Sequence, residues 1–191
     1  MFETTLSNFA MFLGLLLAVP SVIGLTSPDK FKTAMRQFSR SNAWGYFFML
    51  LGTAWFVHNV NQEQVADFQS YKKILLSFFA GVGIASCIFV RDFLAVRGAA
   101  VVSLLLARWM VDTGRPLLGG SSWVILWQAW AYIFVIAGIW LTVSPWRLRD
   151  FIHWATDTEQ RIRITCGARL AFCLLIVILG ATVYRTAQAG Q

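Results

Sequence analysis

Three ionisable side chains lie within one strongly apolar segment of the chain, residues 93–112, which charged residues flank on both sides. Arg97 and Arg108 are eleven residues apart, about three helical turns, so a helix would carry both on nearly one face. Asp112 follows Arg108 at i+4, where opposite charges on a helix can meet. An ionisable group on a membrane-spanning helix is by default a candidate functional site. The chemistry indicated is binding of an anionic group within the membrane.

A structural interpretation of these residues is favoured over the functional one. Each arginine is expected about one turn from a membrane face, where a long side chain can reach the headgroups at small cost. Gln128 is expected at the depth of Arg108, and a hydrogen bond between them would satisfy both groups. The intramembrane polar site predicted from the sequence comprises Arg97, Arg108, Asp112 and Gln128.

The residues offer no constellation for catalysis. We find no Ser/His/Asp grouping at one depth, no carboxylate pair inside an apolar segment and no glycine-rich phosphate loop. His58 and His153 are expected on opposite sides of the membrane, so one chain cannot ligate a haem through both. Cys87, Cys166 and Cys173 have no CxxC or zinc spacing. We therefore predict that the protein is not an enzyme and has no cofactor and no metal site.

Composition places the whole chain in a membrane. Its 191 residues are 58% hydrophobic and 13% charged, whereas soluble domains average about 25% charged residues. The net charge of +7 would suggest nucleic acid as a partner of a soluble protein. Here the basic residues adjoin apolar segments, so we expect anionic lipid headgroups as their partner and no nucleic acid. Residues 1–191 are predicted to form a single helical-bundle domain.

Six apolar segments have the length that a bilayer core requires. They cover about residues 8–25, 43–60, 74–90, 93–112, 123–143 and 167–184. The fourth segment is the least regular because Arg97 and Arg108 interrupt it. If it did not span, the last two helices would be inverted relative to the first two. The sequence thus predicts an all-α integral membrane protein with about six transmembrane helices.

Lysine and arginine gather in the loops on one side, which orients the chain. That side has the following basic residues: Lys30, Lys32, Arg36, Arg40, Arg91, Arg97, Arg147, Arg149, Arg161 and Arg163, with Arg169 just inside the sixth segment. The opposite side has Lys72, Lys73, Arg115 and Arg185. The richer side is predicted to be cytoplasmic, with both termini outside, in a bacterial inner membrane.

Two cytoplasmic loops open on the same dipeptide, Ser27-Pro28 and Ser144-Pro145. Serine suits the residue before a helix and proline its first position. Apolar residues then recur at helical spacing beside basic ones, which predicts short amphipathic helices over residues 28–39 and 145–155 in the headgroup layer. Thr156 and Glu159 have capping-box spacing, so the last helix is expected to begin well before the membrane and to run for about thirty residues.

The two loops and their flanking segments suggest a weak parallel internal repeat. The first segment, loop and second segment correspond to the fifth segment, loop and sixth segment. The outgoing segments carry Leu51-Gly52-Thr53-Ala54 and Leu179-Gly180-Ala181-Thr182. A true duplication and independent convergence on common membrane patterns remain the two interpretations.

Two stripes of side chains predict helix packing or a partner surface. Ser77, Gly81 and Ala85 form a ridge of small residues at i, i+4 and i+8, as Gly14 and Ala18 do on the first segment. Such ridges allow close helix contact in lipid, and packing within the monomer is favoured over an oligomer interface.

An aromatic stripe follows helical spacing on the fifth segment: Trp123, Trp127, Trp130 and Phe134. The favoured interpretation is an interfacial belt in contact with lipid. The alternatives are a partner surface and a groove for a quinone, pigment or lipid tail.

These observations predict a non-catalytic accessory or scaffold subunit of a larger membrane assembly. Its expected partners are the bilayer, anionic headgroups on the cytoplasmic side, and other membrane subunits or further copies of the chain. The alternative is a small carrier or binding protein for an amphipathic or anionic molecule, such as a lipid, quinone or pigment, held by Arg97 or Arg108.

Overall fold

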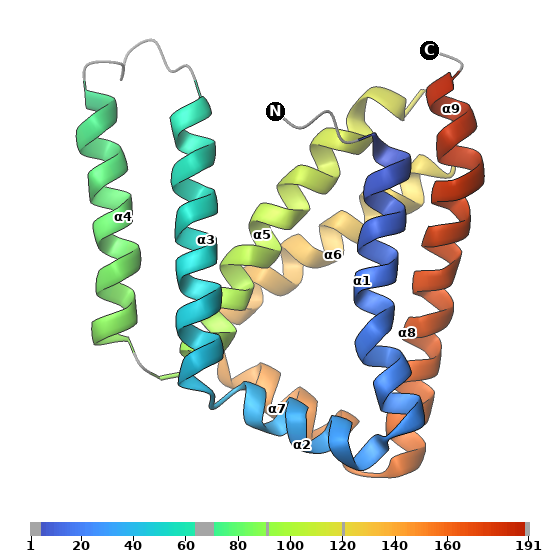
Figure 1. The fold of residues 1–191 in the computed structure, drawn as a ribbon, viewed down its shortest axis with the longest axis horizontal. Coiled ribbons are helices and arrows are strands. Elements are labelled where there is room, and N and C mark those ends of the chain that lie inside the picture. Colours follow the sequence, from blue (N-terminus) through green and yellow to red (C-terminus); the bar gives the residue numbers. More distant parts are fainter. Residues whose placement is uncertain (1–4, 64–70, 91, 120, 190–191) are drawn as a thin grey trace. The chain divides into compact units, whose positions relative to one another are not determined.

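The computed structural model describes residues 5–63, 71–90, 92–119 and 121–189, and the regular elements among them are all helices (Figure 1). Five helices are long and apolar enough to cross a membrane. They are α1 (Leu6–Thr26), α4 (Lys72–Phe89), α5 (Leu94–Gly114) with the short η2 (Arg115–Leu117), α6 (Val124–Val143), and α8 (Glu159–Leu179) with its extension. The predicted all-α class is confirmed, and each of the five matches a predicted segment.

The second predicted segment is α3 (Asn42–Gln62), which is as long as α1 but less apolar. It is not among the five because tryptophan, tyrosine and polar side chains interrupt its apolar residues. These include Trp44, Tyr46, Trp55, His58 and Asn59. The sixth span stays a prediction.

Two compact units make up the chain, and several helices contribute residues to both. Unit 1 comprises residues 1–36, 107–133 and 150–191, and unit 2 comprises residues 37–106 and 134–149. The single domain predicted over residues 1–191 stays a prediction.

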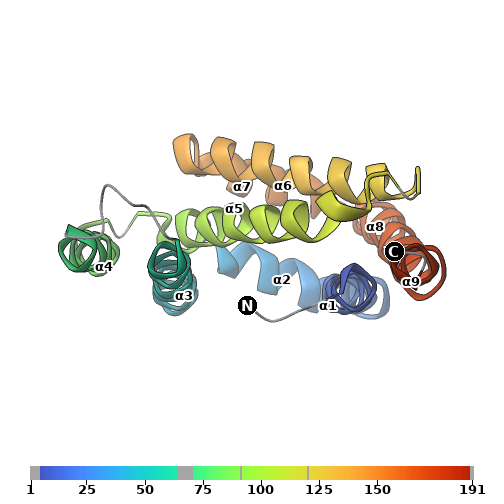
Figure 2. The same cartoon turned by 90° about the horizontal axis from the view of Figure 1, so that it is seen from above.

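In unit 1, α1 and α8 run antiparallel and side by side (Figures 1 and 2). Small residues allow the two backbones to approach closely. A Cβ at Gly14 would lie 2.7 Å from Val177 Cγ2 and 3.1 Å from the carbonyl oxygen of Cys173. Near the start of α1, the Ser7 hydroxyl donates a hydrogen bond to the carbonyl oxygen of Gly180 at 2.8 Å. Close backbone packing of this kind holds helices together in lipid, where the hydrophobic effect between them is absent.

The last helix is long, as predicted. α8 continues through the π-helical η3 (Gly180–Tyr184) into α9 (Arg185–Ala189), and Glu159–Gln188 is an unbroken run of 30 residues. Its capping residue is Thr158, whose hydroxyl accepts from the Arg161 backbone N–H at 3.3 Å. The predicted capping box is therefore wrong. Thr156 instead ends the preceding helix, where its hydroxyl donates to the Ile152 carbonyl at 2.7 Å.

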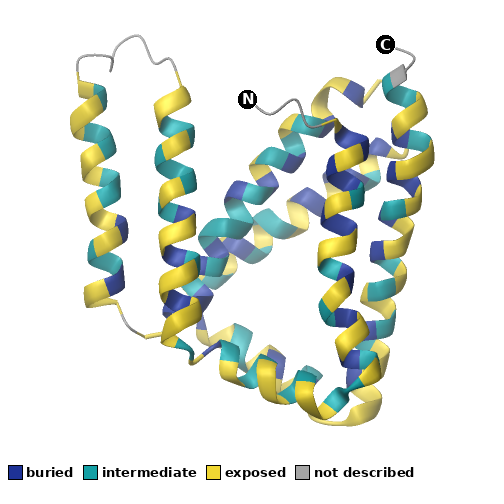
Figure 3. Ribbon diagram, in the orientation of Figure 1, coloured by how far each residue is buried: buried dark blue, intermediate teal, exposed yellow. Residues whose placement is uncertain are grey.

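Unit 2 is built on the antiparallel pair of α3 and α4, with the first half of α5 packed against α3. A Cβ at Gly83 of α4 would overlap the Thr53 side chain of α3, and a Cβ at Gly98 of α5 would lie 2.6 Å from the Met49 nitrogen. Met49, Cys87 and Leu94 form the buried cluster of this unit. Most residues of α3 and α4 nevertheless remain exposed or half-buried (Figure 3).

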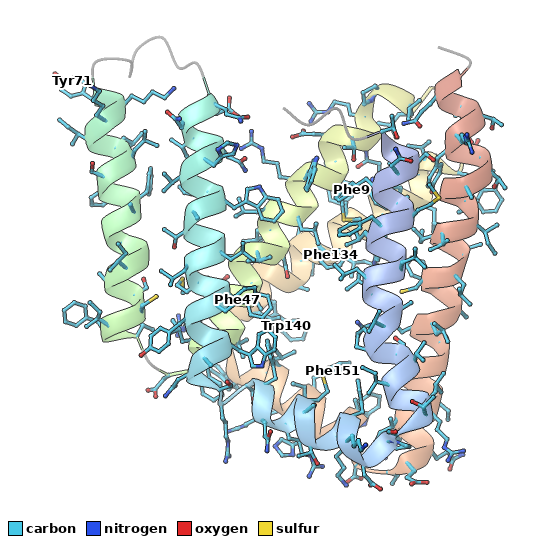
Figure 4. All side chains as sticks on the ribbon, viewed as in Figure 1. Phe9, Phe47, Tyr71, Phe134, Trp140 and Phe151 are labelled. Carbon is cyan, nitrogen blue, oxygen red and sulfur yellow. The ribbon has the colours of Figure 1, made fainter. Side chains whose placement is uncertain are left out.

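Short helices occupy both Ser-Pro loops, at the predicted residues. They are α2 (Pro28–Phe38) and α7 (Trp146–Ala155). Before each proline, the serine N–H bonds back to the preceding helix at 2.8 Å, from Ser27 to Ile23 and from Ser144 to Trp140. On α7, Ile152 is buried while Phe151 is exposed (Figure 4). The location of these helices in the headgroup layer stays a prediction.

The two predicted repeat copies have nearly equal helices. α1, α2 and α3 have 21, 11 and 21 residues, and α6, α7 and α8 have 20, 10 and 21. In both copies a hydroxyl caps the third helix: Ser41 accepts from Trp44 N–H, and Thr158 accepts from Arg161 N–H. The two stretches thus agree in element order, length and capping, and the internal repeat stays a prediction.

Candidate functional site

Six aromatic side chains form a connected cluster in unit 1, which we call the aromatic cluster: Phe9, Trp109, Trp127, Trp130, Phe172 and Tyr184. Phe9, labelled in Figure 4, has its ring centroid 4.5 Å from that of Trp109 and 5.5 Å from that of Trp127. Trp127 and Tyr184 are fully buried. Tilted and edge-to-face rings at such distances attract each other beyond their buried area. The cluster therefore links α1, α5, α6 and α8 within unit 1.

Two neighbouring residues of α6 donate hydrogen bonds to the last turns of α5. Trp127 Nε1 donates to the Met110 carbonyl at 2.8 Å, and Gln128 Nε2 donates to the Val111 carbonyl at 3.1 Å. Gly114 leaves the space for both side chains, since a Cβ there would lie 2.6 Å from Gln128 Nε2. Both acceptors lie in the last turns of α5, so the two side chains tie the first turns of α6 to the end of α5.

Tyr184 adds a further polar contact to the aromatic cluster. Its hydroxyl donates to the Trp123 carbonyl at 3.0 Å, while its ring lies 6.5 Å from that of Trp127. Tyr184 is the last residue of the π-helical η3. A π-helical turn changes the direction of the side chains that follow it, and this turn accompanies the burial of Tyr184.

The predicted polar site is divided by the structure. Arg108, Asp112 and Gln128 belong to unit 1, and Arg97 belongs to unit 2. Arg108 pairs with Asp112, with Nε 3.7 Å from Oδ2 and both side chains about half exposed. The hydrogen bond predicted between Arg108 and Gln128 is wrong. Gln128 Oε1, the acceptor of that side chain, is buried without a hydrogen-bond partner, and its Nε2 is bonded to Val111.

Arg97 lies on the first turn of α5 in unit 2. Its side chain is half-buried, and its Nε is buried without a hydrogen-bond partner in the described residues. Phe93, one turn earlier, has a φ of 54°, a left-handed conformation that bulky residues rarely adopt. The guanidinium carbon of Arg149 lies 5.9 Å from the centroid of the Phe93 ring. The side chains of Arg97 and Arg149 thus both lie at the start of α5, and the Nε donor of Arg97 is unsatisfied.

The two ridges of small residues have different surroundings. Gly14 and Ala18 are buried on α1, where Gly14 packs against α8. On α4, Ser77 and Gly81 are exposed and Ala85 is half-buried, and a Cβ at Gly81 would have no atom within 4 Å. α4 contacts α3 through a different face, which includes Gly83. The second ridge is therefore left open by the chain's own packing.

The aromatic stripe of α6 is also divided. Trp123 is 52% exposed, whereas Trp127 is fully buried and Trp130 is 8% exposed. Phe134 is half-buried and belongs to unit 2. The predicted lipid-facing belt is therefore wrong for Trp127 and Trp130, because both side chains face other helices of their own unit. The sequence alone could not separate these residues, since all four share one helical face.

Arg169 makes a contact that the sequence did not predict. Arg169 was expected just inside the last helix, near the cytoplasm. Its Nη2 donates to the Leu17 carbonyl at 3.3 Å, and Leu17 is the twelfth of the 21 residues of α1. Arg169 shares a helical face with the buried residues Cys166 and Cys173 at i−3 and i+4, and this spacing was the available signal.

Neither metal-ligand groups nor known relatives indicate a cofactor or an activity. Among the described residues, no group of three or more His, Cys, Asp or Glu side chains could hold a metal ion. His58 is hydrogen-bonded to Gln62 at 2.8 Å, and the three cysteines are free and buried. No protein-family model, curated protein or solved structure matches this chain.

Proposed function

We propose that this chain is a non-catalytic, six-span subunit of a larger membrane assembly, with α4 as its main docking helix. The observation that carries the proposal is the exposure of α4. In its most apolar stretch of 18 residues, only 11% of α4 is buried by the chain, compared with 28–44% in the other four candidate spans. A span so poorly covered has the most surface left for contact with another protein.

The ridge of Ser77, Gly81 and Ala85 supports the same proposal. Small residues at i, i+4 and i+8 let a neighbouring helix approach closely, and packing then replaces the absent hydrophobic effect. Gly81 has open space around its Cβ position. The ridge is thus suited to receive a helix from another subunit or from a second copy of the chain.

A matched pair of glycines on α4 tests the proposal. Gly81→Leu is expected to leave the melting temperature unchanged and to abolish co-purification of partner subunits in mild detergent. Gly83→Leu is expected to lower stability by about 1–3 kcal/mol, because the new side chain must displace Thr53. Thermal unfolding and native mass spectrometry on both variants measure the two effects. Partners retained by Gly81→Leu at wild-type levels would exclude this ridge as the docking face.

A second candidate function is a carrier or binding protein for an amphipathic or anionic molecule such as a lipid, quinone or pigment. The buried, unpartnered Nε of Arg97 favours it, because a guanidinium at the edge of a span can hold an anionic group. The purified wild-type chain separates the two functions. Co-purifying subunits support the first, and a bound small molecule seen by mass spectrometry or absorption supports the second.

We further propose that the protein lies in a bacterial inner membrane with both termini outside and with α2 and α7 along the cytoplasmic headgroups. The excess of basic residues in the Ser-Pro loops supports this orientation, and the same residues would attract anionic lipids.

Cysteine labelling in intact cells tests the orientation. The native cysteines are buried, so engineered cysteines should dominate the signal. Thr33→Cys on α2 should resist a membrane-impermeant reagent until the cells are opened, whereas Ser122→Cys, which is exposed between α5 and α6, should react at once. Reaction of Thr33→Cys from outside would reverse the proposed topology.

A further inference from the structure

The guanidinium of Arg169 lies at the middle of a membrane-spanning helix pair. Its Nη2 is 3.3 Å from the Leu17 carbonyl oxygen. Leu17 is nine residues from the end of α1 at Thr26 and eleven from its start at Leu6, about 14 Å and 16 Å along the axis. These distances compare with a half-thickness of about 15 Å for the hydrocarbon core. Because α1 is long and apolar enough to cross a membrane, the charged group itself, and not only its Cα, lies near the middle of a candidate span.

Most of the hydrogen-bonding capacity of Arg169 is unused by its own chain. A guanidinium has five N–H donors, and the Leu17 carbonyl accepts from one of them in the part of the chain that the structure describes. The side chain is exposed. Polar groups at this depth are normally paired, so the position calls for a group from outside the chain.

The chain cannot supply the counter-charge. Each carboxylate in the described residues lies in a connecting segment, in α2 or α7, or within five residues of the end of a candidate span. Asp112, the one nearest to the interior of a span, already pairs with Arg108 near the end of α5. A second copy of the chain has the same sequence and so offers no mid-span carboxylate in these regions. Phospholipid phosphates lie at the membrane surface, about 15 Å from this depth.

We propose that Arg169 forms an intramembrane ion pair with an Asp or Glu on a transmembrane helix of a different protein. Ionisable residues inside membranes pair with one another, and arginine suits carboxylate because its donors form a planar fork. Exposed apolar residues of α1, among them Leu16 and Val19, provide surface for the same helix. This inference rests on the proposed role as a complex subunit, and it adds that the assembly contains an unlike chain with a carboxylate at mid-membrane.

The first experiment removes the charge. Arg169→Gln should weaken partner binding in mild detergent by roughly thirtyfold or more, as loss of one member of a buried charge pair does. Arg163→Gln is the matched control on the same helix, because Arg163 is exposed and pairs with Glu159 at 3.9 Å near the start of α8. It should leave binding unchanged. Arg169→Lys retains the charge and is expected to keep the partner. If Arg169→Gln fails to accumulate, Arg169→Lys takes its place, and loss of the partner from that variant would contradict a pair held by charge.

The second experiment identifies the partner group. A photo-crosslinker at Leu16, which is 53% exposed beside Leu17, should capture a transmembrane segment that contains Asp or Glu near its centre. Exchanging the charges, with Arg169→Glu in this chain and arginine in place of the captured carboxylate, should restore the complex that Arg169→Glu alone loses.

The outcomes separate this inference from the proposed function. A complex that survives Arg169→Gln, or a captured helix without a central carboxylate, overturns the ion pair and leaves the subunit role standing. A wild-type chain that purifies with a bound anionic amphiphile, absent from Arg169→Gln, overturns the ion pair in favour of a small ligand. A wild-type chain that purifies alone, with neither, overturns the subunit role itself.

Discussion

Replacing Trp127 by alanine is expected to lower the free energy of unfolding by about 3 kcal/mol, the lower end of the range for large aromatic core residues. Trp127 is fully buried, contacts the rings of Phe9, Trp130 and Tyr184, and donates to the Met110 carbonyl at 2.8 Å. We expect the lower end of the range because the unfolded helices remain in an apolar medium, so little free energy of transfer from water is lost. The main cost is the cavity that the missing ring leaves. Thermal unfolding followed by circular dichroism in mild detergent measures the loss.

Two control variants accompany this substitution. One separates the contribution of the ring from that of its N–H group, and the other tests an exposed tryptophan. Trp127→Phe keeps an aromatic ring and loses the donor, so it should cost only about 1 kcal/mol. Trp123→Ala removes an exposed tryptophan of the same helix and should change stability little, since Trp123 is 52% exposed. Equal losses for Trp127→Ala and Trp123→Ala would show that the aromatic cluster does not hold unit 1 together.

Gly14→Leu is expected to separate α1 from α8 and to destabilise unit 1 by about 3 kcal/mol, near the upper end for overpacked cores. A Cβ at Gly14 would meet Val177 Cγ2 at 2.7 Å and the backbone oxygen of Cys173 at 3.1 Å. The side chain of Val177 can move, but the backbone of α8 can move only if the helices part. The measurement is again thermal unfolding in mild detergent.

Gly167→Leu on α8 is the matched control for this substitution. A Cβ at Gly167 would have no atom within 4 Å, so the larger side chain has space. Replacing glycine in a helix also removes a helix-destabilising residue, and the variant should be as stable as the wild type or slightly more so. A Gly14→Leu protein with wild-type stability would contradict the close packing of α1 on α8.

The helices themselves could be read from the sequence because their signals are local. Long apolar runs predict spans, and the Ser-Pro pairs predict the starts of α2 and α7. The long last helix was foreseen too, although from a capping box at Thr156 and Glu159 that the structure does not contain. The capping residue was not, because Thr156 and Thr158 both have a hydroxyl near the correct place. Only the backbone path, which ends α7 at Ala155 and begins α8 at Glu159, selects Thr158.

The candidate sites depended on tertiary structure because side chains on one helical face can meet different neighbours. Periodicity placed Trp123 and Trp127 in one stripe, and packing buried Trp127 while leaving Trp123 exposed. Periodicity also predicted Gly81 as a packing residue of α4, whereas the observed contact between α4 and α3 is at Gly83.

By itself, the sequence determined that the chain is all-helical, with several helices long and apolar enough to cross a membrane. It did so because bilayer thickness and charge placement act on each segment separately. Only the tertiary structure decided that the Arg169 side chain reaches Leu17, near the middle of α1. The depth of a side chain follows from the antiparallel register of α1 and α8, which close contacts at Gly14 and Gly180 set across more than 150 residues of chain.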